Sequence, residues 1–225
     1  FINTPNNPTG RVFVPDELAA VARLAIEGDF FIITDEIYEH VLYVGTHICL
    51  AADPSLRDRV VVVSGCSKTF SVTGWRVGTI LAPPDLTAAI RKVHDFLTVG
   101  APAPLQDACA VGLETLGPEY YAGLAEGYRE RRSVLLQALD AAGFTFTSPE
   151  GAYYVLADFR ALGGEDDVAF ARRLTREAGV APVPGSSFFS RRESGRDLVR
   201  FAFCKRVETL EEAGERLVRF AGAGG

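Results

Sequence analysis

The run Val60-Val61-Val62-Val63 constrains the fold of this chain more than any other segment. Four consecutive β-branched residues favour a strand, and an unbroken apolar run is typical of a strand that a parallel sheet buries on both faces. The segment that follows, residues 64–78, changes at once to small and polar residues with one lysine and one arginine. Because ligands of α/β sheets bind where strands end at their carboxyl edge, this segment predicts a binding site.

Lysine is rare in this chain. Lysine and arginine together number 23, and only Lys68, Lys92 and Lys205 are lysines. Arginine stays protonated, whereas a desolvated lysine can lose its proton and attack a carbonyl group, so Lys68 is a candidate nucleophile. The residues around Lys68 also resemble a phosphate-binding P-loop. That motif requires glycine directly before the lysine, where this chain has Ser67, and we therefore reject it.

Two other expected strands also end in polar residues. Residues 1–4 predict a strand that leads into N-N-P-T-G at 6–10, and the apolar run 30–33 predicts a buried strand that leads into D-E-I-Y at 35–38. If these strands are neighbours of the one at 60–63, Asn7, Asp35 and Lys68 converge at one sheet edge. Taken singly, Asn7 also fits a tight turn and Asp35 fits a helix cap. Glu36 is expected to face solvent.

Composition narrows the class of protein. Of 225 residues, 48% are apolar and 23% are charged, as in ordinary globular proteins. The net charge of -6 argues against nucleic-acid binding, and no apolar run approaches the length that spans a membrane. The four cysteines and three histidines lack metal-ligand spacing, which favours reduced thiols, a cytoplasmic location and no metal site. The chain opens at Phe1 and contains no methionine, and we interpret it as a fragment.

The pattern of elements predicts an α/β chain with two domains. Expected helices span 15–27, 84–97, 105–116, 118–142, 166–178 and 207–221, and further expected strands span 77–81, 144–147, 152–158, 180–183 and 198–203. The pattern changes after the long helix 118–142. We therefore predict one domain over residues 1–120 and a smaller one over 121–225, with the boundary inside that helix.

The polar residues at the strand ends match the groups of one cofactor, pyridoxal 5'-phosphate. Its aldehyde forms a Schiff base with a lysine, and its ring nitrogen stays protonated only beside an anion such as Asp35. Its phenolic oxygen accepts hydrogen bonds from neutral donors, for which Asn7 and Tyr38 are available. Its phosphate requires an arginine such as Arg76 together with hydroxyl or backbone donors.

Four motifs together resemble the class I/II aminotransferases, the pyridoxal-phosphate enzymes of the aspartate aminotransferase fold. They are N-N-P-T-G at 6–10, D-E-I-Y at 35–38, S-K-T-F-S-V-T-G-W-R-V-G at 67–78 and R-F-A-F at 200–203. The resemblance implies a fold type I transferase: the C-terminal part of the large mixed-sheet domain, followed by a smaller α+β domain. It also implies that about 150 residues precede the first motif in relatives.

The resemblance assigns roles to individual residues. It implies that Lys68 forms the Schiff base, Asp35 contacts the pyridine nitrogen, and Asn7 and Tyr38 contact the phenolic oxygen. It implies that Arg76 binds the phosphate, and that Arg200 binds the substrate carboxylate. Many relatives carry a phosphate-binding serine three residues before the lysine, where this chain has Gly65. Ser67 or Ser64 could supply that hydroxyl, or neither could.

The implied activity is transfer of an amino group from an L-amino acid to a 2-oxo acid, with ping-pong kinetics. Lys68 serves as general base and acid in this reaction. Two alternatives stay open: a carbon–sulfur lyase on the same scaffold, and the aminotransferase-like domain of a transcription regulator. The resemblance further implies a homodimer, with amino acid and 2-oxo acid substrates and neither nucleic acid nor membrane as a partner.

Overall fold

The computed structural model describes residues 1–223, which form two compact units. Unit 1 comprises Phe1–Asn6 and Val12–Leu124, and unit 2 comprises Asn7–Arg11 and the described residues from Ala125 onward. The units therefore divide inside one long helix, α5, which spans Pro118–Ala141. The short segment of residues 7–11, which precedes most of unit 1 in the sequence, packs with unit 2.

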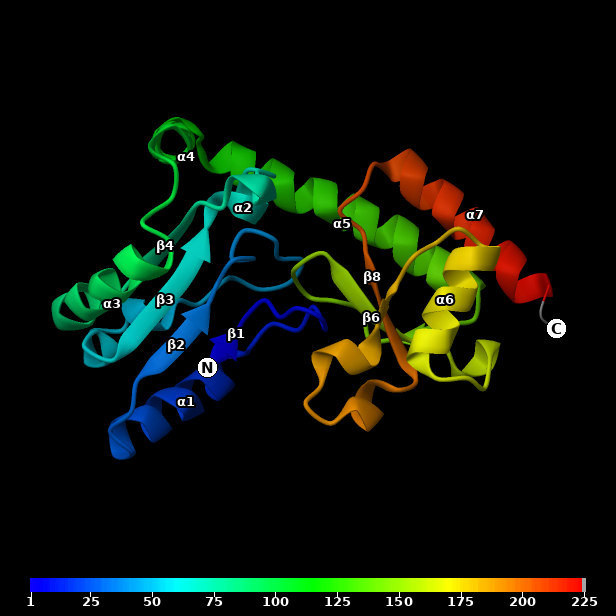
Figure 1. The fold of residues 1–225 in the computed structure, drawn as a ribbon, viewed down its shortest axis with the longest axis horizontal. Coiled ribbons are helices and arrows are strands. Elements are labelled where there is room, and N and C mark those ends of the chain that lie inside the picture. Colours follow the sequence, from blue (N-terminus) through cyan, green and yellow to red (C-terminus); the bar gives the residue numbers. More distant parts are fainter. Residues whose placement is uncertain (224–225) are drawn as a thin grey trace. The chain divides into compact units, whose positions relative to one another are not determined.

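Unit 1 is built on a mixed four-stranded sheet in the order β1-β2-β3-β4 (Figure 1). The strands are β1 (Ile2–Asn3), β2 (Ile32–Asp35), β3 (Val60–Gly65) and β4 (Gly78–Leu81). The first three run parallel and β4 runs antiparallel to β3. The helices are α1 (Pro15–Glu27), α2 (Cys66–Thr69), α3 (Pro84–Leu97) and α4 (Ala103–Thr115). The neighbouring parallel strands place the ends of β1, β2 and β3 at one edge of the sheet.

Strand β2 lies two residues later than the sequence predicts. The amide of Phe30 bonds to the carbonyl of Ala25 at 3.1 Å, so Phe30 belongs to the turn that ends α1. Pairing with β3 begins only at Ile32, which lies opposite Val60. Ile32 is buried while Ile33 is exposed, so this strand alternates instead of being buried on both faces. The shift is useful for function because it makes Asp35 the last residue of the strand.

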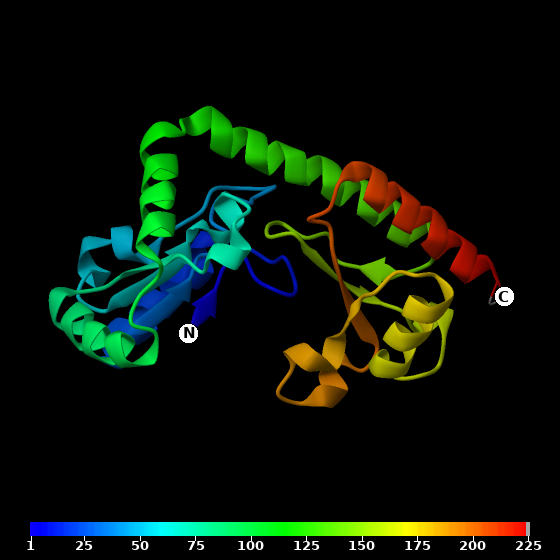
Figure 2. The same ribbon diagram turned by 45° about the horizontal axis from the view of Figure 1, so that its top comes forward.

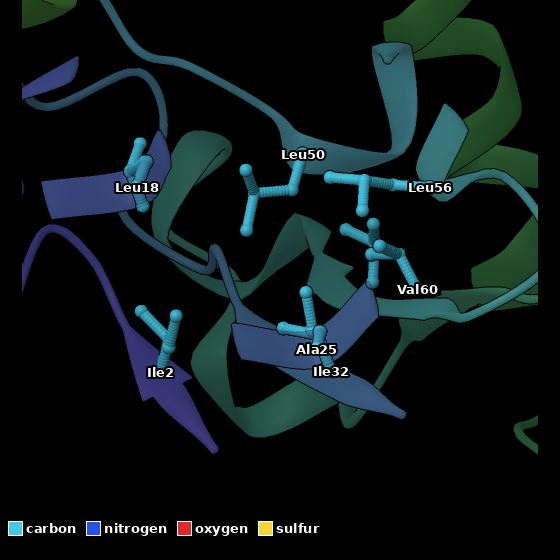
Figure 3. Packing of buried hydrophobic residues seen from close by; sticks show 8 residues of the cluster. Ile2, Leu18, Ala25, Ile32, Leu50, Leu56 and Val60 are labelled. Carbon is cyan, nitrogen blue, oxygen red and sulfur yellow. The ribbon is translucent and has the colours of Figure 1, made fainter. Parts of the chain in front are cut away.

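The core of unit 1 lies between the sheet and α1. Its buried members come from β1, α1, β2, β3 and the short 3-10 turns Leu50–Ala52 and Pro54–Leu56. They are Ile2, Leu18, Ala25, Ile32, Leu50, Leu56, Val60 and Val62, most of which Figure 3 labels. Burying such side chains stabilises the fold by about 1.5–3 kcal/mol each, and this packing fixes where the strands end.

Unit 2 contains an antiparallel four-stranded sheet in the order β5-β6-β8-β7. Its strands are β5 (Thr145–Phe146), β6 (Tyr154–Asp158), β7 (Val183–Pro184) and β8 (Leu198–Ala202). Its helices are the second part of α5, α6 (Asp167–Glu177) and α7 (Val207–Ala223). Further 3-10 turns in the chain span Thr73–Trp75, Arg160–Leu162, Gly185–Phe188 and Arg192–Gly195.

Aromatic packing holds unit 2 together. The ring of Phe170 on α6 stacks on Phe159 at 4.0 Å between centroids, and Phe144 contacts both Phe170 and Phe201 edge-on. Figures 1 and 2 both show α7 beside the second part of α5. A Cβ atom at Gly214 of α7 would lie 2.6 Å from the Ala138 Cβ of α5, so this close approach requires glycine. Within the described residues, no helix has both the length and the apolar character needed to cross a membrane.

Candidate functional site

Asp35 and Lys68 lie at the carboxyl ends of neighbouring parallel strands. Asp35 ends β2 and lies opposite Val63 of β3, whereas Lys68 lies on α2, the short helix that begins directly after β3. The Asp35 Oδ1 accepts a hydrogen bond from the backbone amide of Ile37 at 3.2 Å. Within residues 1–223 Asp35 forms no ion pair. A half-buried carboxylate with no cation beside it is suited to accept a cationic group from a ligand.

The local contacts of Lys68 tie α2 to the turn that precedes β4. Its Nζ donates to the Thr73 Oγ1 at 3.4 Å, and that hydroxyl in turn donates to the backbone carbonyl of Ser67 at 3.1 Å. Lys68 as a whole residue is half-buried. The helix α2 is a single turn, which means that these side-chain contacts contribute to its orientation.

The glycine three residues before Lys68 is required by the sheet. Gly65 of β3 lies opposite Gly78 of β4. A Cβ atom at Gly65 would lie 2.8 Å from the Gly78 Cα and 2.9 Å from the Val77 carbonyl oxygen. A serine here would push β4 away from β3. The Ser64 hydroxyl donates to the Glu39 carboxylate at 2.6 Å, so of the two serines Ser67 is the better candidate for a phosphate contact.

Ser67 and Arg76 line one cavity of about 760 Å³ in unit 1. Residues of the loop 98–102 also line it, but Asp35, Tyr38 and Lys68 do not. Arg76 lies in the left-handed region at φ 57°, and its Nη1 donates to the Thr73 carbonyl at 3.1 Å. A side chain in that backbone region costs about 1–3 kcal/mol and is common at binding sites, because the surrounding structure must hold it there. The cavity thus joins a hydroxyl and a guanidinium, two groups that bind phosphate.

Tyr38 is carried by a turn that a buried polar network holds in place. Tyr38 is buried, and its neighbour Glu36 is only 2% exposed, so the prediction that Glu36 faces solvent was wrong. The Glu36 carboxylate accepts from the Thr34 hydroxyl at 2.8 Å and lies 2.6 Å from the Nε2 of His47. The Glu36 amide also bonds to the Val63 carbonyl at 2.8 Å, which extends the ladder between β2 and β3. Glu36 faces inward because His47 and Thr34 satisfy its charge.

Glu36, Glu39 and His47 place their ligand atoms within 4.8 Å of one another, close enough to be considered as a metal site. The 2.6 Å separation between Glu36 and His47 is that of a charge-assisted hydrogen bond. The Glu39 carboxylate is likewise bonded to Ser64. Hydrogen bonds within the cluster and to Ser64 therefore account for its short distances.

Two titratable groups of this region make stability fall in acid. Burial lowers the pKa of His40 below its ordinary value of 6.5. For Glu36, burial acts to raise the pKa, but hydrogen bonds from His47 and Thr34 outweigh it and lower the pKa below 4.5. In both cases the unfolded chain takes up a proton before the folded chain does as the pH drops, so the free energy of unfolding falls. The loss develops as the pH falls through 6.5 for His40 and through 4.5 for Glu36.

We therefore expect urea unfolding of the full-length protein to show a decrease in stability from about pH 7.5 to about pH 5.5. The variant His40→Phe keeps a ring beside Tyr121, which His40 contacts at 4.5 Å between centroids, but cannot titrate. It should show a shallower decrease over this range. An equal decrease in both proteins would contradict the assignment to His40.

Arg200 and Asn7 are bonded to each other in unit 2. Arg200 lies in the centre of the sheet on β8, opposite Leu156 of β6 and Val183 of β7. Its Nη1 donates to the Asn7 Oδ1 at 2.7 Å. The bond uses the carbonyl oxygen of the Asn7 amide as acceptor, and the Nδ2 group of the same amide can only donate. That is the role that the resemblance requires of it.

The comparisons with known proteins decide the family. The family described as Aminotransferase class I and II matches residues 1–217 of this chain. The chain belongs to that family. It is 39% identical over 218 residues to methionine aminotransferase of Escherichia coli, covering 96% of this chain and 56% of that protein. It is 37% identical over 223 residues to aspartate/prephenate aminotransferase of Thermus thermophilus, covering 98% and 56%.

Solved structures of the family confirm the predicted fold. The structure of N-succinyldiaminopimelate aminotransferase from Mycobacterium tuberculosis superimposes with a TM-score of 0.92 at 38% identity, covering 97% of this chain and 57% of that chain. The fold type I class predicted from the four motifs is thereby confirmed. The chain spans slightly more than half the length of the relatives that it matches.

Sequence reasoning missed several residues that shape these surroundings. It did not pair Glu36 with His47, although an acidic residue directly after a buried strand is a signal that a partner exists. It placed Tyr154 in the expected strand 152–158 without linking it to Arg200, and it did not identify Phe188. Both of these rings contact Arg200, and nothing in their spacing along the chain indicates it.

Proposed function

We propose that the protein containing this chain is a pyridoxal-phosphate-dependent aminotransferase that moves an amino group from an L-amino acid to a 2-oxo acid. The observation that carries the proposal is the pair Asp35 and Lys68. A carboxylate without a cation and a lysine lie at the carboxyl ends of adjacent parallel strands of one sheet. Membership of the class I and II aminotransferase family supports it.

The residues of unit 1 fit pyridoxal phosphate. Asp35 offers its carboxylate to the ring nitrogen, and the buried Tyr38 offers a phenol to the phenolic oxygen of the cofactor. Ser67 and Arg76, which line the same cavity, suit the phosphate. In unit 2, the Nδ2 group of Asn7 suits the phenolic oxygen as well. These roles follow the family motifs, residue by residue.

When bound, pyridoxal phosphate supplies an aldehyde that condenses with amines and a protonated ring that withdraws electrons from the adjacent carbon. Lys68 has two tasks in the proposed reaction. It holds the cofactor through Nζ before substrate arrives, and its amine then removes a proton from the substrate Cα and returns it at another atom. Asp35 keeps the proton on the ring nitrogen, because an ionised carboxylate favours the charged form of its partner.

Arg200 is proposed to bind the α-carboxylate of both substrates. Within the described residues its guanidinium forms no ion pair, and its Nε is buried without a hydrogen-bond partner. A buried donor without a partner costs free energy until a ligand satisfies it. A carboxylate is the natural ligand because it can bond to two guanidinium nitrogens at once.

A carbon–sulfur lyase on the same scaffold is the second candidate, and it would use the same residues. The named relatives reported above are all aminotransferases, which favours transamination over elimination. Those relatives also give no support to the regulator alternative. A homodimer and a cytoplasmic location complete the proposal. The four cysteines are all free thiols, which supports that location.

The proposal is tested by assaying the full-length protein with pyridoxal phosphate, a panel of L-amino acids and 2-oxoglutarate. We expect the new oxo acid and glutamate in equal amounts, and parallel lines in double-reciprocal plots as ping-pong kinetics requires. Cystathionine without any oxo acid serves as the control. Release of pyruvate from cystathionine, with no amino transfer from any donor, would establish the lyase instead.

A further inference from the structure

The guanidinium of Arg200 lies over the faces of two aromatic rings. Its Cζ is 4.2 Å from the ring centroid of Tyr154, the first residue of β6, and 4.6 Å from that of Phe188, which ends the 3-10 turn Gly185–Phe188. Both distances lie well within the range of cation–π attraction. Together with the hydrogen bond to Asn7, these contacts restrict the guanidinium to one place and one orientation.

A second arginine of unit 2 shows what such an arrangement looks like when it is only structural. The Arg173 Cζ also lies over two rings, 4.7 Å from the centroid of Phe220 and 5.3 Å from that of Phe170. Its Nε, however, bonds to the Glu165 carboxylate at 2.6 Å, and its Nη2 bonds to a backbone carbonyl at 2.9 Å. The charge of Arg173 is therefore neutralised inside the protein.

Arg200 differs from Arg173 in lacking an internal anion. Within residues 1–223 its one hydrogen-bond acceptor is the neutral amide of Asn7, and its Nε is buried and unsatisfied. Ring faces attract the cation but cannot replace an anion, because they accept no strong hydrogen bond. The rings hold the charge in place and leave its N–H groups to an external acceptor.

We infer that Phe188 and Tyr154 are positioning residues that fix the Arg200 guanidinium for an incoming carboxylate. The inference rests on the proposed role of Arg200 in binding the substrate α-carboxylate. The rings cover part of the guanidinium, so a carboxylate must approach its N–H edge, which is the approach that a two-point contact requires. Both half-reactions use an acid with this carboxylate, so losing a ring should weaken binding of the amino acid and of the oxo acid alike.

The test compares Phe188→Leu with Phe188→Tyr in the full-length protein loaded with pyridoxal phosphate. Leucine removes the ring face, whereas tyrosine retains it. Phe189→Leu, the same change at the next residue, is the matched control. Calorimetry measures the Kd of two acids that cannot react because they lack an amino or oxo group: maleate, with an acidic tail, and 3-phenylpropanoate, with an apolar tail. Initial rates give kcat and KM separately.

We expect Phe188→Leu to raise both Kd values and both KM values by about 2- to 30-fold, the range of one cation–π contact, with little change in kcat. Phe188→Tyr should restore binding, and Phe189→Leu should leave it unchanged. Weaker binding of 3-phenylpropanoate alone would show that Phe188 contacts the substrate tail and would overturn the inference. Unchanged Kd values for Phe188→Leu would also overturn it.

A parallel variant separates this inference from the proposed function. Arg200→Ala should raise the Kd values of both acids more than Phe188→Leu does, because it removes the whole cation. If Arg200→Ala leaves both Kd values unchanged, the proposed role of Arg200 fails. If only the Phe188 variants are without effect, the positioning role alone fails. A thermal unfolding curve for each variant shows that the comparison is made between folded proteins.

Discussion

Lys68→Ala in the full-length protein is expected to lower the rate of transamination by about 10⁴-fold or more, the upper end of the effect of one positioned acid–base group. The reason is that alanine removes both proposed tasks of Lys68, which are holding the cofactor and moving the proton at the substrate Cα. The measurement is oxo acid formation with the best amino donor, together with the absorbance of the bound cofactor.

The chain offers two matched controls, because it has only two other lysines. Lys92 and Lys205 are both exposed, and Lys92 lies on the outer helix α3. Lys92→Ala and Lys205→Ala should keep activity within about 2-fold of the parent, as surface substitutions usually change little. Retention of both activity and the cofactor absorbance by Lys68→Ala would refute the role of Lys68.

His47→Ala is expected to lower the free energy of unfolding by about 3–5 kcal/mol, the range for a buried pair that loses one partner. Glu36 is 2% exposed and His47 14%, so the carboxylate would remain in the interior without its histidine partner. The Thr34 hydroxyl would still donate to it. A loss of this size is a large part of the stability of an ordinary domain. Urea unfolding followed by circular dichroism measures it.

The control for this prediction is an exposed pair of an acidic and a basic side chain. Arg219 and Glu215 lie 3.7 Å apart on α7 and are 68% and 72% exposed. Glu215→Ala should change the free energy of unfolding by less than about 1 kcal/mol. The double variant Glu36→Gln with His47→Ala should recover part of the loss, since glutamine carries no charge. If His47→Ala and Glu215→Ala lower the free energy of unfolding by equal, small amounts, the Glu36–His47 contact is not the buried pair described above.

The sequence was sufficient to predict the elements that short motifs and apolar runs define. The strand that begins at Val60 and the helix Pro84–Leu97 both followed from local patterns. The fold class was predictable as well, because four family motifs occur in this chain in a fixed order.

Contacts between residues that lie far apart in the chain were not predictable. The inward direction of Glu36 depends on His47, eleven residues later, and the register of β2 depends on where β3 begins to pair. Arg200 takes its two rings from β6 and from the turn Gly185–Phe188, and the order of the second sheet brings β6 beside β8. Such contacts follow from tertiary packing. Hydrophobic periodicity indicates secondary structure and does not predict them.

One measurement tests the central claim most directly. The full-length protein is loaded with pyridoxal phosphate and treated with borohydride, which makes the bond between the cofactor and its lysine permanent. Peptide mass spectrometry then locates the modified residue among Lys68, Lys92 and Lys205. We predict one cofactor per chain, attached at Lys68. Attachment at Lys92 or Lys205, or no attachment while transamination proceeds, would contradict the account.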